Sequence, residues 1–375
     1  MEENSDILFD ELFQDYKNRG DIQEFGKVIG RGGYGRVRDV KYKNKSFAGK
    51  LFIKNNYDES KEISDLRGPN IIKIQKICEP RQKDGNTYQL ILMEKAILRD
   101  LGKLNQYLHE KNLLRLIFDH CFDEPLSDSL LRFYCKQIVR GLECLYKNNY
   151  VHFDIKPENI LIASNLVLKI SDFSTLRKIS DDVDEIKIPG GTPGYLSPEY
   201  YSKEKVPKNS TQKQDFFALG ATLFYLKFGK SFMKYHRNKE NNEENKKLTA
   251  DLIIDLLMKN INYINSQKLL NGDLIHFLTK LIQFTPEERY SFKNIYRNKW
   301  LNSDLDLINH SVGFYEMDDE KLLIELQKQD FFKQKIQIFK YNKKIMETNN
   351  SKRIMPKKIN IGKKFKIKKS IFASK

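Results

Sequence analysis

A short polar segment of the sequence brings together side chains that could transfer a phosphoryl group. In YVHFDIKPENILI (150–162), Asp154, Lys156 and Asn159 share one predicted loop between apolar residues. A carboxylate there could accept a hydroxyl proton, a lysine could contact a phosphoryl group, and an asparagine could bind a hard cation. Asp172 follows thirteen residues after Asn159, behind the predicted strand VLKIS, and is a second candidate Mg²⁺ ligand. A solvated turn would explain one of these residues but poorly explains all four in this order.

Three glycines form a second candidate phosphate site. Gly30, Gly32 and Gly35 give the pattern G-x-G-x-x-G in GRGGYGRV. The pattern alone is weak, because it also occurs in dinucleotide-binding folds, where a helix follows, and by chance. Here strand-like residues follow, including Val37, so a strand–turn–strand could lay backbone N–H groups over phosphates. A plain hairpin turn is the alternative interpretation.

Lys50 lies fifteen residues after Gly35, inside the predicted strand SFAGKLFIK. Its ammonium group could reach solvent, or it could point inward as a cation for a polyphosphate. An inward lysine needs a carboxylate to orient it. Glu59 and Glu62 are the candidates, because they lie just downstream on the helix-like stretch 57–66.

The apolar pattern divides the chain into a strand-rich part and a helical part. The strand-like runs are 25–30, 34–43, 46–54, 71–78 and 87–94. Helical spacing starts near residue 100 and is clearest at 127–147, with Ser127 as the predicted N-cap. The residues on one face of this helix are Leu130, Leu131, Tyr134, Ile138, Leu142 and Leu145. Further helices are predicted at 214–229, 251–260 and 273–284, and polar insertions at 103–126 and 236–247.

Taken together, these motifs resemble those of the eukaryotic protein kinase family, Ser/Thr type. GRGGYGRV matches the glycine-rich loop, FAGK the strand lysine, HFDIKPEN the catalytic loop, DFS the D-F-G motif and GTPGYLSPE the A-P-E region. Asp215 in DFFALG resembles the aspartate of the family's D-x-W-S-x-G helix. Arg289 stands where the family's arginine pairs with the A-P-E glutamate, which is Glu199 in this chain.

The resemblance covers residues 20–302 and implies an α+β, bilobal protein-kinase-like fold. A small antiparallel-sheet N-lobe with one helix is expected at about 20–94, and a larger, mainly helical C-lobe at about 95–302. Residues 1–19 would then be an N-terminal extension and residues 303–375 a C-terminal extension.

The resemblance also implies ATP and Mg²⁺ as cofactors, a protein substrate, and a role for each matched residue. Asp154 would accept the proton of the substrate hydroxyl, and Lys156 and Thr192 would join it in the substrate loop. The implied catalytic residues are Asp154, Lys156, Lys50 and Thr192, and the implied Mg²⁺ ligands are Asn159 and Asp172. The implied nucleotide-binding residues are Gly30, Gly32, Gly35, Val37, Ala48, Lys50, Glu59, Met93, Glu94 and Ala96, with Met93 as gatekeeper and residues 94–96 as hinge.

Two substitutions depart from the family pattern. Phe153 replaces the catalytic-loop arginine that normally pairs with an activation-loop phosphate, so we expect no activating phosphate on 172–199 to be required. Alanine at every Ser and Thr of 174–187 should therefore leave the protein active. Ser174 replaces the glycine of D-F-G, and serine reaches some glycine torsions only at a cost. A pseudokinase that binds ATP or acts as a scaffold is the alternative to an active enzyme, although Lys50 and both motif aspartates are retained.

The spacing between the strand lysine and its carboxylate partner is a third departure. Glu59 lies only nine residues after Lys50, about half the family's usual separation, so the connecting turn must be short. Glu59 is the favoured partner, and Glu62, one turn further along the same face, is the alternative.

Composition adds a cellular setting and a second region. The chain has 375 residues and a formal net charge of +16, of which +14 belongs to residues 331–375. This basic tail could bind nucleic acid, an anionic membrane or acidic protein, could act as a pseudosubstrate, or could be a disordered solubilising segment. The four cysteines predict buried thiols rather than disulfides, and no run is long enough to span a membrane. We expect an intracellular protein in the cytoplasm, with the nucleus as the alternative, and of unknown oligomeric state.

Overall fold

The computed structural model describes most of the chain up to residue 303. The described residues are 2–32, 35–54, 63–64, 66–96, 100–103, 128–163, 167–180, 182, 184–202, 205–229 and 272–303. Several predictions fall outside them, namely the helix at 251–260, both polar insertions apart from residue 103, the N-cap Ser127, the carboxylates Glu59 and Glu62, and the basic tail.

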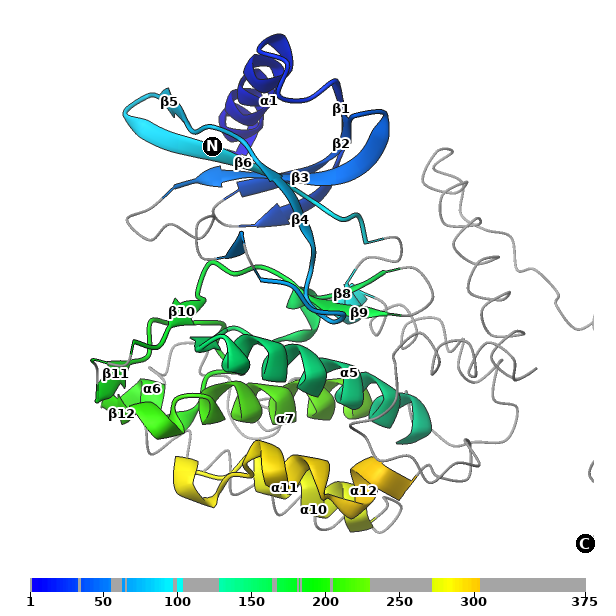
Figure 1. Cartoon of the computed structure of the whole chain (residues 1–375), viewed down its shortest axis with the longest axis vertical. Coiled ribbons are helices and arrows are strands. Elements are labelled where there is room, and N and C mark those ends of the chain that lie inside the picture. Colours follow the sequence, from blue (N-terminus) through cyan, green and yellow to red (C-terminus); the bar gives the residue numbers. More distant parts are fainter. Residues whose placement is uncertain are drawn as a thin grey trace, which may run out of the picture. The chain divides into compact units, whose positions relative to one another are not determined.

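The N-lobe is built on an antiparallel sheet (Figure 1). Its strands follow the spatial order β1 (Glu24–Gly32), β2 (Gly35–Tyr42), β3 (Lys45–Ile53), β6 (Asn86–Met93) and β4 (Ile74–Ile77), and β5 (Arg81–Lys83) pairs with β6. Lys43 and Asn44 turn β2 into β3 with positive φ angles of 50° and 59°, the torsions of a tight hairpin that follows the twist of the strands. The predicted strands are confirmed, and β5 is an addition to them.

The two faces of this sheet have different partners, because successive strand residues point to opposite sides. The register places Val37 opposite Lys50 and Ala48 opposite Met93, so these four side chains share one face. The opposite face carries the apolar residues Val40, Leu51, Leu90 and Leu92, which are all buried.

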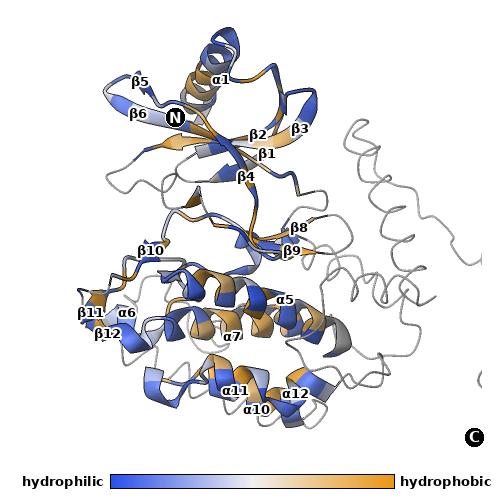
Figure 2. Ribbon diagram, in the orientation of Figure 1, coloured by the Kyte–Doolittle hydropathy of each residue, from blue (hydrophilic) through white to orange (hydrophobic). Residues whose placement is uncertain are grey.

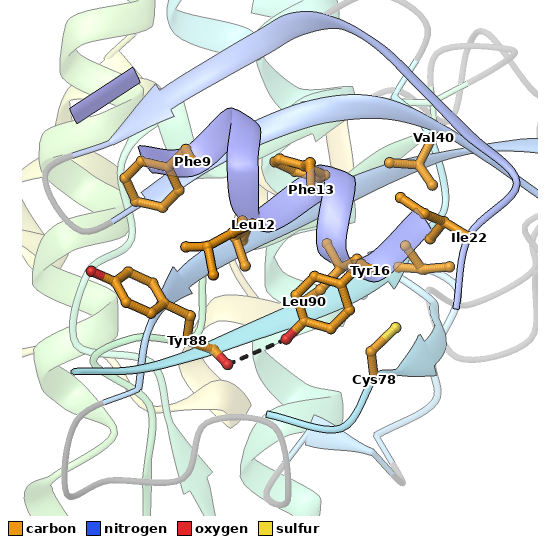
Figure 3. Close-up of a cluster of buried hydrophobic side chains, with 11 residues drawn as sticks. Phe9, Leu12, Phe13, Tyr16, Ile22, Val40, Cys78, Tyr88 and Leu90 are labelled. Atoms are coloured by element: carbon orange, nitrogen blue, oxygen red, sulfur yellow. Dashed lines mark hydrogen bonds between the residues drawn. The ribbon is translucent and has the colours of Figure 1, made fainter. Parts of the chain in front are cut away.

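Helix α1 (Glu2–Asn18) covers this apolar face. Phe9, Leu12, Phe13 and Tyr16 follow the spacing of one helix side and are buried against the sheet (Figure 3). The Tyr16 hydroxyl donates a hydrogen bond to the carbonyl oxygen of Tyr88 at 3.3 Å. The sequence analysis predicted no helix in this segment, although its apolar period is readable.

Helices α5 (Asp128–Lys147) and α7 (Lys213–Phe228) form the middle of the C-lobe. The predicted face of α5 is confirmed at Leu131, Tyr134, Ile138, Leu142 and Leu145, which are all buried. Nearly every residue of α7 is buried, so the helix is largely apolar around its whole circumference (Figure 2). Packed with them are α10 (Gly272–Leu281), α11 (Phe292–Tyr296) and α12 (Lys299–Asn302).

Short strand pairs position the loops of the C-lobe. β7 (Tyr150–Val151) pairs with β10 (Arg177–Lys178), β8 (Ile160–Ile162) with β9 (Leu168–Ile170), and β11 (Glu185–Lys187) with β12 (Lys205–Pro207). The short helix α6 (Pro198–Ser202) lies between β11 and β12 in the sequence. This arrangement of an antiparallel-sheet N-lobe and a helical C-lobe confirms the predicted fold class. None of the helices in the described part of the chain has the length and apolar character needed to cross a membrane.

Candidate functional site

The loop between β7 and β8 gathers its polar side chains around Asp154. The Oδ2 atom of Asp154 accepts hydrogen bonds from Lys156 Nζ at 2.8 Å and from Asn159 Nδ2 at 3.0 Å. Asn159 also donates to the backbone carbonyl of Asp154 at 2.8 Å. Asp154 is only 7% exposed, so its carboxylate is held by these donors rather than by solvent.

Thr192 connects this loop to the segment 172–199. Its backbone N–H donates to Asp154 Oδ1 at 2.8 Å, and its hydroxyl oxygen lies 2.5 Å from Lys156 Nζ. The neighbouring Gly191 allows this approach, because a Cβ atom there would lie 2.5 Å from the carbonyl oxygen of Phe153. The structure thus brings together three predicted catalytic residues, Asp154, Lys156 and Thr192.

Asp215 of α7 anchors the backbone of the loop between β7 and β8. Its carboxylate oxygens accept the N–H groups of His152 at 2.8 Å and Phe153 at 2.9 Å. Burial raises the pKa of Asp215, and the hydrogen bonds to backbone amides act against that rise. Its role is therefore to satisfy two buried donors that would otherwise have no acceptor.

His152 is a second anchor, which the sequence analysis did not single out. Its ring is fully buried; Nδ1 accepts the N–H of Asp154 at 3.2 Å, and Nε2 lies 3.1 Å from the carbonyl oxygen of Ser171. An accepting Nδ1 requires the proton on Nε2, which then donates to Ser171. One imidazole ring therefore joins the two loops that carry Asp154 and Asp172.

Lys50 of β3 points toward the C-lobe loop that carries Asp172. Its ammonium nitrogen lies 2.8 Å from Asp172 Oδ1, across 122 residues of sequence. This positive charge lowers the pKa of Asp172 well below its ordinary value of 3.8, so the carboxylate is ionised at neutral pH. Lys50 is thus an inward cation, as one of the two interpretations predicted, whereas its predicted partners Glu59 and Glu62 lie outside the described residues.

The residue after Phe173 does not need the torsions of glycine. Asp172 itself has a left-handed backbone with φ of 61°, whereas Ser174 has no positive φ. In this conformation, serine at the third position of the motif therefore carries no left-handed strain.

Asn159 and Asp172 have the chemistry of a Mg²⁺ site. The Asn159 amide nitrogen is engaged with Asp154, which leaves its amide oxygen for a hard cation, and Asp172 supplies an ionised carboxylate. Within the described ranges, no group of three or more His, Cys, Asp or Glu side chains could hold a metal ion. A site with so few protein ligands suits Mg²⁺, which usually keeps waters and substrate phosphate oxygens as its other ligands.

The glycine pattern lies on a hairpin and not before a helix. Gly30 pairs with Val37, and Gly32 with Gly35, at the end of the β1–β2 register. A Cβ atom at Gly35 would lie 2.4 Å from the carbonyl oxygen of Leu51, so only glycine lets β2 approach β3 this closely. Residues 33 and 34, between the strands, lie outside the described part.

The predicted adenine-binding residues Ala48 and Met93 lie on the same face of the sheet as Lys50. Ala48 and Met93 are directly opposite residues of β3 and β6, and β6 ends at Met93. The Oε1 atom of Glu94, the next residue, accepts a hydrogen bond from the backbone N–H of Lys73 at 2.8 Å. The same oxygen forms an ion pair with Lys169 Nζ at 3.3 Å. These contacts fix the start of the segment 94–96, which includes Ala96.

Phe153 lies in an apolar cluster rather than at the surface. It is 5% exposed and has a φ of 66°. The cluster consists of Val151, Phe153, Ile179, Ile188 and Val206, with Ile186 and Tyr200 packed against it. The sequence indicated what the arginine-to-phenylalanine change removes, and the structure shows that packing between the catalytic loop and 172–199 replaces it.

The predicted ion pair between Glu199 and Arg289 is present. Two guanidinium nitrogens of Arg289 contact the two carboxylate oxygens of Glu199 at 2.7 and 2.8 Å. Gln214 of α7 donates to the same carboxylate at 3.0 Å. Because the Arg289 side chain is fully buried, this bidentate pair fixes α6 against the helices of the C-lobe.

Comparison with known proteins agrees with this geometry. The family model described as "Protein kinase domain" matches residues 23–301. The chain belongs to the protein kinase family. A protein kinase domain implies the use of ATP and Mg²⁺ in general.

Similar proteins carry serine/threonine kinase names, at low identity. A Dictyostelium discoideum protein named a probable serine/threonine-protein kinase is 27% identical over 319 residues, which are 79% of this kinase and 41% of that protein. An Aurora kinase of Eremothecium gossypii is 26% identical over 293 residues, 75% of this kinase and 69% of the relative. The human serine/threonine-protein kinase MRCK alpha is 29% identical over 214 residues, which are 56% of this kinase and 12% of MRCK alpha. The kinase thus covers less than half the length of the Dictyostelium relative.

Proposed function

We propose that this chain is an active serine/threonine kinase that transfers the γ-phosphoryl group of ATP to Ser or Thr hydroxyls of proteins. The observation that carries the proposal is the network of Asp154, Lys156 and Thr192, which joins the catalytic loop to the segment 172–199. A pseudokinase would be expected to lose this network or the Lys50–Asp172 pair.

Each residue of the network has a defined part in the transfer. Asp154 Oδ1 accepts the Thr192 N–H, and its second lone pair could accept the proton of a substrate hydroxyl. Lys156 lies beside the carboxylate, where its charge would stabilise the transferring phosphoryl group. Lys50 would hold the α- and β-phosphates, and Asn159 and Asp172 would hold Mg²⁺, which neutralises charge developing on the phosphates.

A paired transfer assay tests the proposal. The purified chain is incubated with Mg-ATP and a generic Ser/Thr protein substrate beside the Asp154→Asn variant, and nucleotide binding and thermal unfolding are measured for both proteins. We expect transfer by the wild type and a loss of about 10²- to 10⁴-fold in the variant, with nucleotide binding retained. Equal, background-level transfer by both proteins, together with nucleotide binding, would instead show a pseudokinase.

We further propose that transfer does not depend on phosphorylation of the segment 172–199. Three contacts of this segment support the proposal: the apolar cluster around Phe153, the pairing of β10 with β7, and the pairing of β11 with β12. Ile179 also donates its N–H to the carbonyl oxygen of Asn149 at 2.7 Å. These contacts hold the segment without a phosphate, whose usual arginine partner is absent.

The variant with alanine at every Ser and Thr of 174–187, which the sequence led us to expect to be active, is not a suitable test, because Thr175 must be left unchanged. Its hydroxyl donates to the carbonyl oxygen of His152 at 2.8 Å, so alanine there would disturb the catalytic loop itself. The variant Ser174→Ala/Ser180→Ala, treated with phosphatase and checked by mass spectrometry, should keep transfer within about twofold of wild type, the range of an exposed substitution. Activity that disappears with phosphatase and returns on rephosphorylation of this segment would contradict the proposal.

A further inference from the structure

An arginine at the tip of the glycine-rich hairpin is held from above by helix α1. Arg36 of β2 donates from Nε to Asp6 Oδ1 at 2.8 Å, and its guanidinium carbon lies 5.2 Å from the centre of the Phe9 ring. The arginine therefore contacts both a carboxylate and an aromatic face of α1. Both contacts are favourable for a guanidinium group.

A second arginine, two residues further along β2, makes the same two kinds of contact with α1. Arg38 donates to the carboxylate of Asp10, and its guanidinium carbon lies 5.6 Å from the centre of the Phe13 ring. Arg38 also lies 5.3 Å from the ring of Phe25 on β1. Helix α1 thus carries two successive acid–aromatic pairs, and each pair holds one arginine of β2.

The two contacts can form together because the helix and the strand repeat at similar distances. Residues four apart in an α-helix are separated by about 6 Å along its axis, and residues two apart in a strand by about 6.8 Å. Asp6 and Asp10 therefore stay in step with Arg36 and Arg38. A shift of the strand by one residue would instead direct Val37 toward α1, which makes the docking position specific.

Asp6 also acts on the first strand of the hairpin. Arg31 of β1 is the residue directly opposite Arg36, and it donates to Asp6 Oδ2 at 2.6 Å. Two like charges directly opposite each other destabilise a strand pair, and the carboxylate between them removes that repulsion. The next pair toward the tip is Gly32 and Gly35, so Asp6 joins the two strands immediately before the glycine turn.

We propose that α1 positions the glycine-rich hairpin for nucleotide binding, with Asp6 as the positioning residue. The inference rests on the proposed function, because it assumes that this hairpin covers the phosphates of ATP. Asp6 lies on the sheet face opposite Lys50 and touches no reacting atom. Its side chain is 33% exposed and that of Arg31 is 55% exposed, so the contact restrains the hairpin without locking it.

Three full-length variants test the inference. Asp6→Asn removes the charge, Asp6→Glu restores it, and Glu11→Gln removes a charge from the same helix at an exposed pair with Lys83, away from the hairpin. We measure amide hydrogen exchange of residues 26–38 without nucleotide, the Kd for Mg-ADP, and KM for ATP and kcat in the transfer assay.

Asp6→Asn should speed exchange in the hairpin and raise KM for ATP and Kd for Mg-ADP by about three- to fivefold, because a smaller fraction of the hairpin is in the binding-competent position. The value of kcat should stay within about twofold, because Asp6 touches no reacting atom and a loss of nucleotide binding alone raises KM and leaves kcat unchanged. Asp6→Glu should recover wild-type values, and Glu11→Gln should match the wild type throughout.

Unchanged exchange and unchanged KM in Asp6→Asn would overturn the inference, as would equal effects of Glu11→Gln. A wild type that binds no Mg-ADP would overturn the role in nucleotide binding and the proposed function together. If the wild type bound no Mg-ADP but amide exchange in 26–38 still rose only in Asp6→Asn, the restraint of the hairpin by α1 would be supported although the proposed function had failed.

Discussion

The catalytic loop and the glycine-rich hairpin are both held by an aspartate that accepts two donors, but in opposite surroundings. Asp215 is 4% exposed and accepts two backbone N–H groups, whereas one-third of the Asp6 side chain is exposed and it accepts from two arginine side chains. A buried unsatisfied donor is costly, and an exposed ion pair is cheap to break. Under the proposed function, the fixed loop would keep the geometry of the transfer step, whereas the hairpin would admit and release the nucleotide.

Breaking the buried anchor should have the largest effect. In Asp215→Ala, the N–H groups of His152 and Phe153 lose their acceptor, so we expect a fall in kcat of about 10²-fold, comparable to the loss of a positioned catalytic group. The free energy of unfolding should fall by about 2–4 kcal/mol for the two unsatisfied donors. Transfer kinetics at saturating ATP and urea denaturation measure the two effects. Asp215→Asn keeps one acceptor oxygen, so its kcat and its free energy of unfolding should lie between those of the wild type and those of Asp215→Ala. Wild-type values for the alanine variant would contradict the role of Asp215 as an anchor of the loop.

Substitution in the apolar cluster around Phe153, which is also buried, should have the next largest effect. Phe153→Ala should lower the free energy of unfolding by about 3 kcal/mol, and Phe153→Leu by less than about 1.5 kcal/mol, because leucine refills most of the volume. The stability of both variants is measured by urea denaturation, and their transfer rates are measured after phosphatase treatment. Equal stability of the alanine variant and wild type would show that packing at Phe153 does not fasten the segment 172–199.

Salt sharpens the comparison at the exposed anchor. The ratio of KM for ATP in Asp6→Asn to that of the wild type should be about threefold or more at low salt and approach one near 1 M salt, where the Debye length falls to about 3 Å. The ratio cancels the general effect of salt on ATP binding. The same series with Asp215→Ala should show a loss of kcat that salt does not remove, and a constant KM ratio for Asp6→Asn would argue against an ionic restraint.

Acid should produce the smallest effect. Hydrogen bonds from Arg36 and then Arg31 lower the pKa of Asp6 below its ordinary value of 3.8. A lowered pKa in the folded state means that the contact stabilises the fold fully above 3.8 and loses that contribution as the pH falls through the lowered value. The difference in Tm between wild type and Asp6→Asn should therefore be constant from about pH 5 to 8 and shrink below about pH 4. A difference that grew toward acid pH would have the wrong sign.

The parts of the site that the sequence predicted are those fixed by local order along the chain. Asp154, Lys156 and Asn159 are neighbours in one loop, so their types and spacing already indicated that they would lie close together, although their hydrogen bonds to one another were not predicted. The Glu199–Arg289 pair spans 90 residues and was available only through the resemblance. The Lys50–Asp172 pair was not predicted as a pair, because each residue had been given a separate partner or ligand.

The parts that the sequence did not predict depend on how distant segments dock. The arginines of β2 have no property in sequence that pairs them with Asp6 and Asp10, because the match needs helix α1 at one position on the sheet. Phe153 indicated a lost charge partner, but its cluster draws on four separated segments. The left-handed backbone of Asp172 likewise has no sequence signal, since aspartate adopts many torsions.

The position of α1 on the sheet also sets the order of events during synthesis. The α1 segment leaves the ribosome before any strand it covers, and a single helix of 17 residues is marginal in water. Its apolar side can be completely buried only after β6 has been made, since Tyr88, Leu90 and Leu92 belong to the same core. The nascent N-lobe must therefore keep Phe9, Phe13 and Tyr16 from other partners until about residue 93 has emerged.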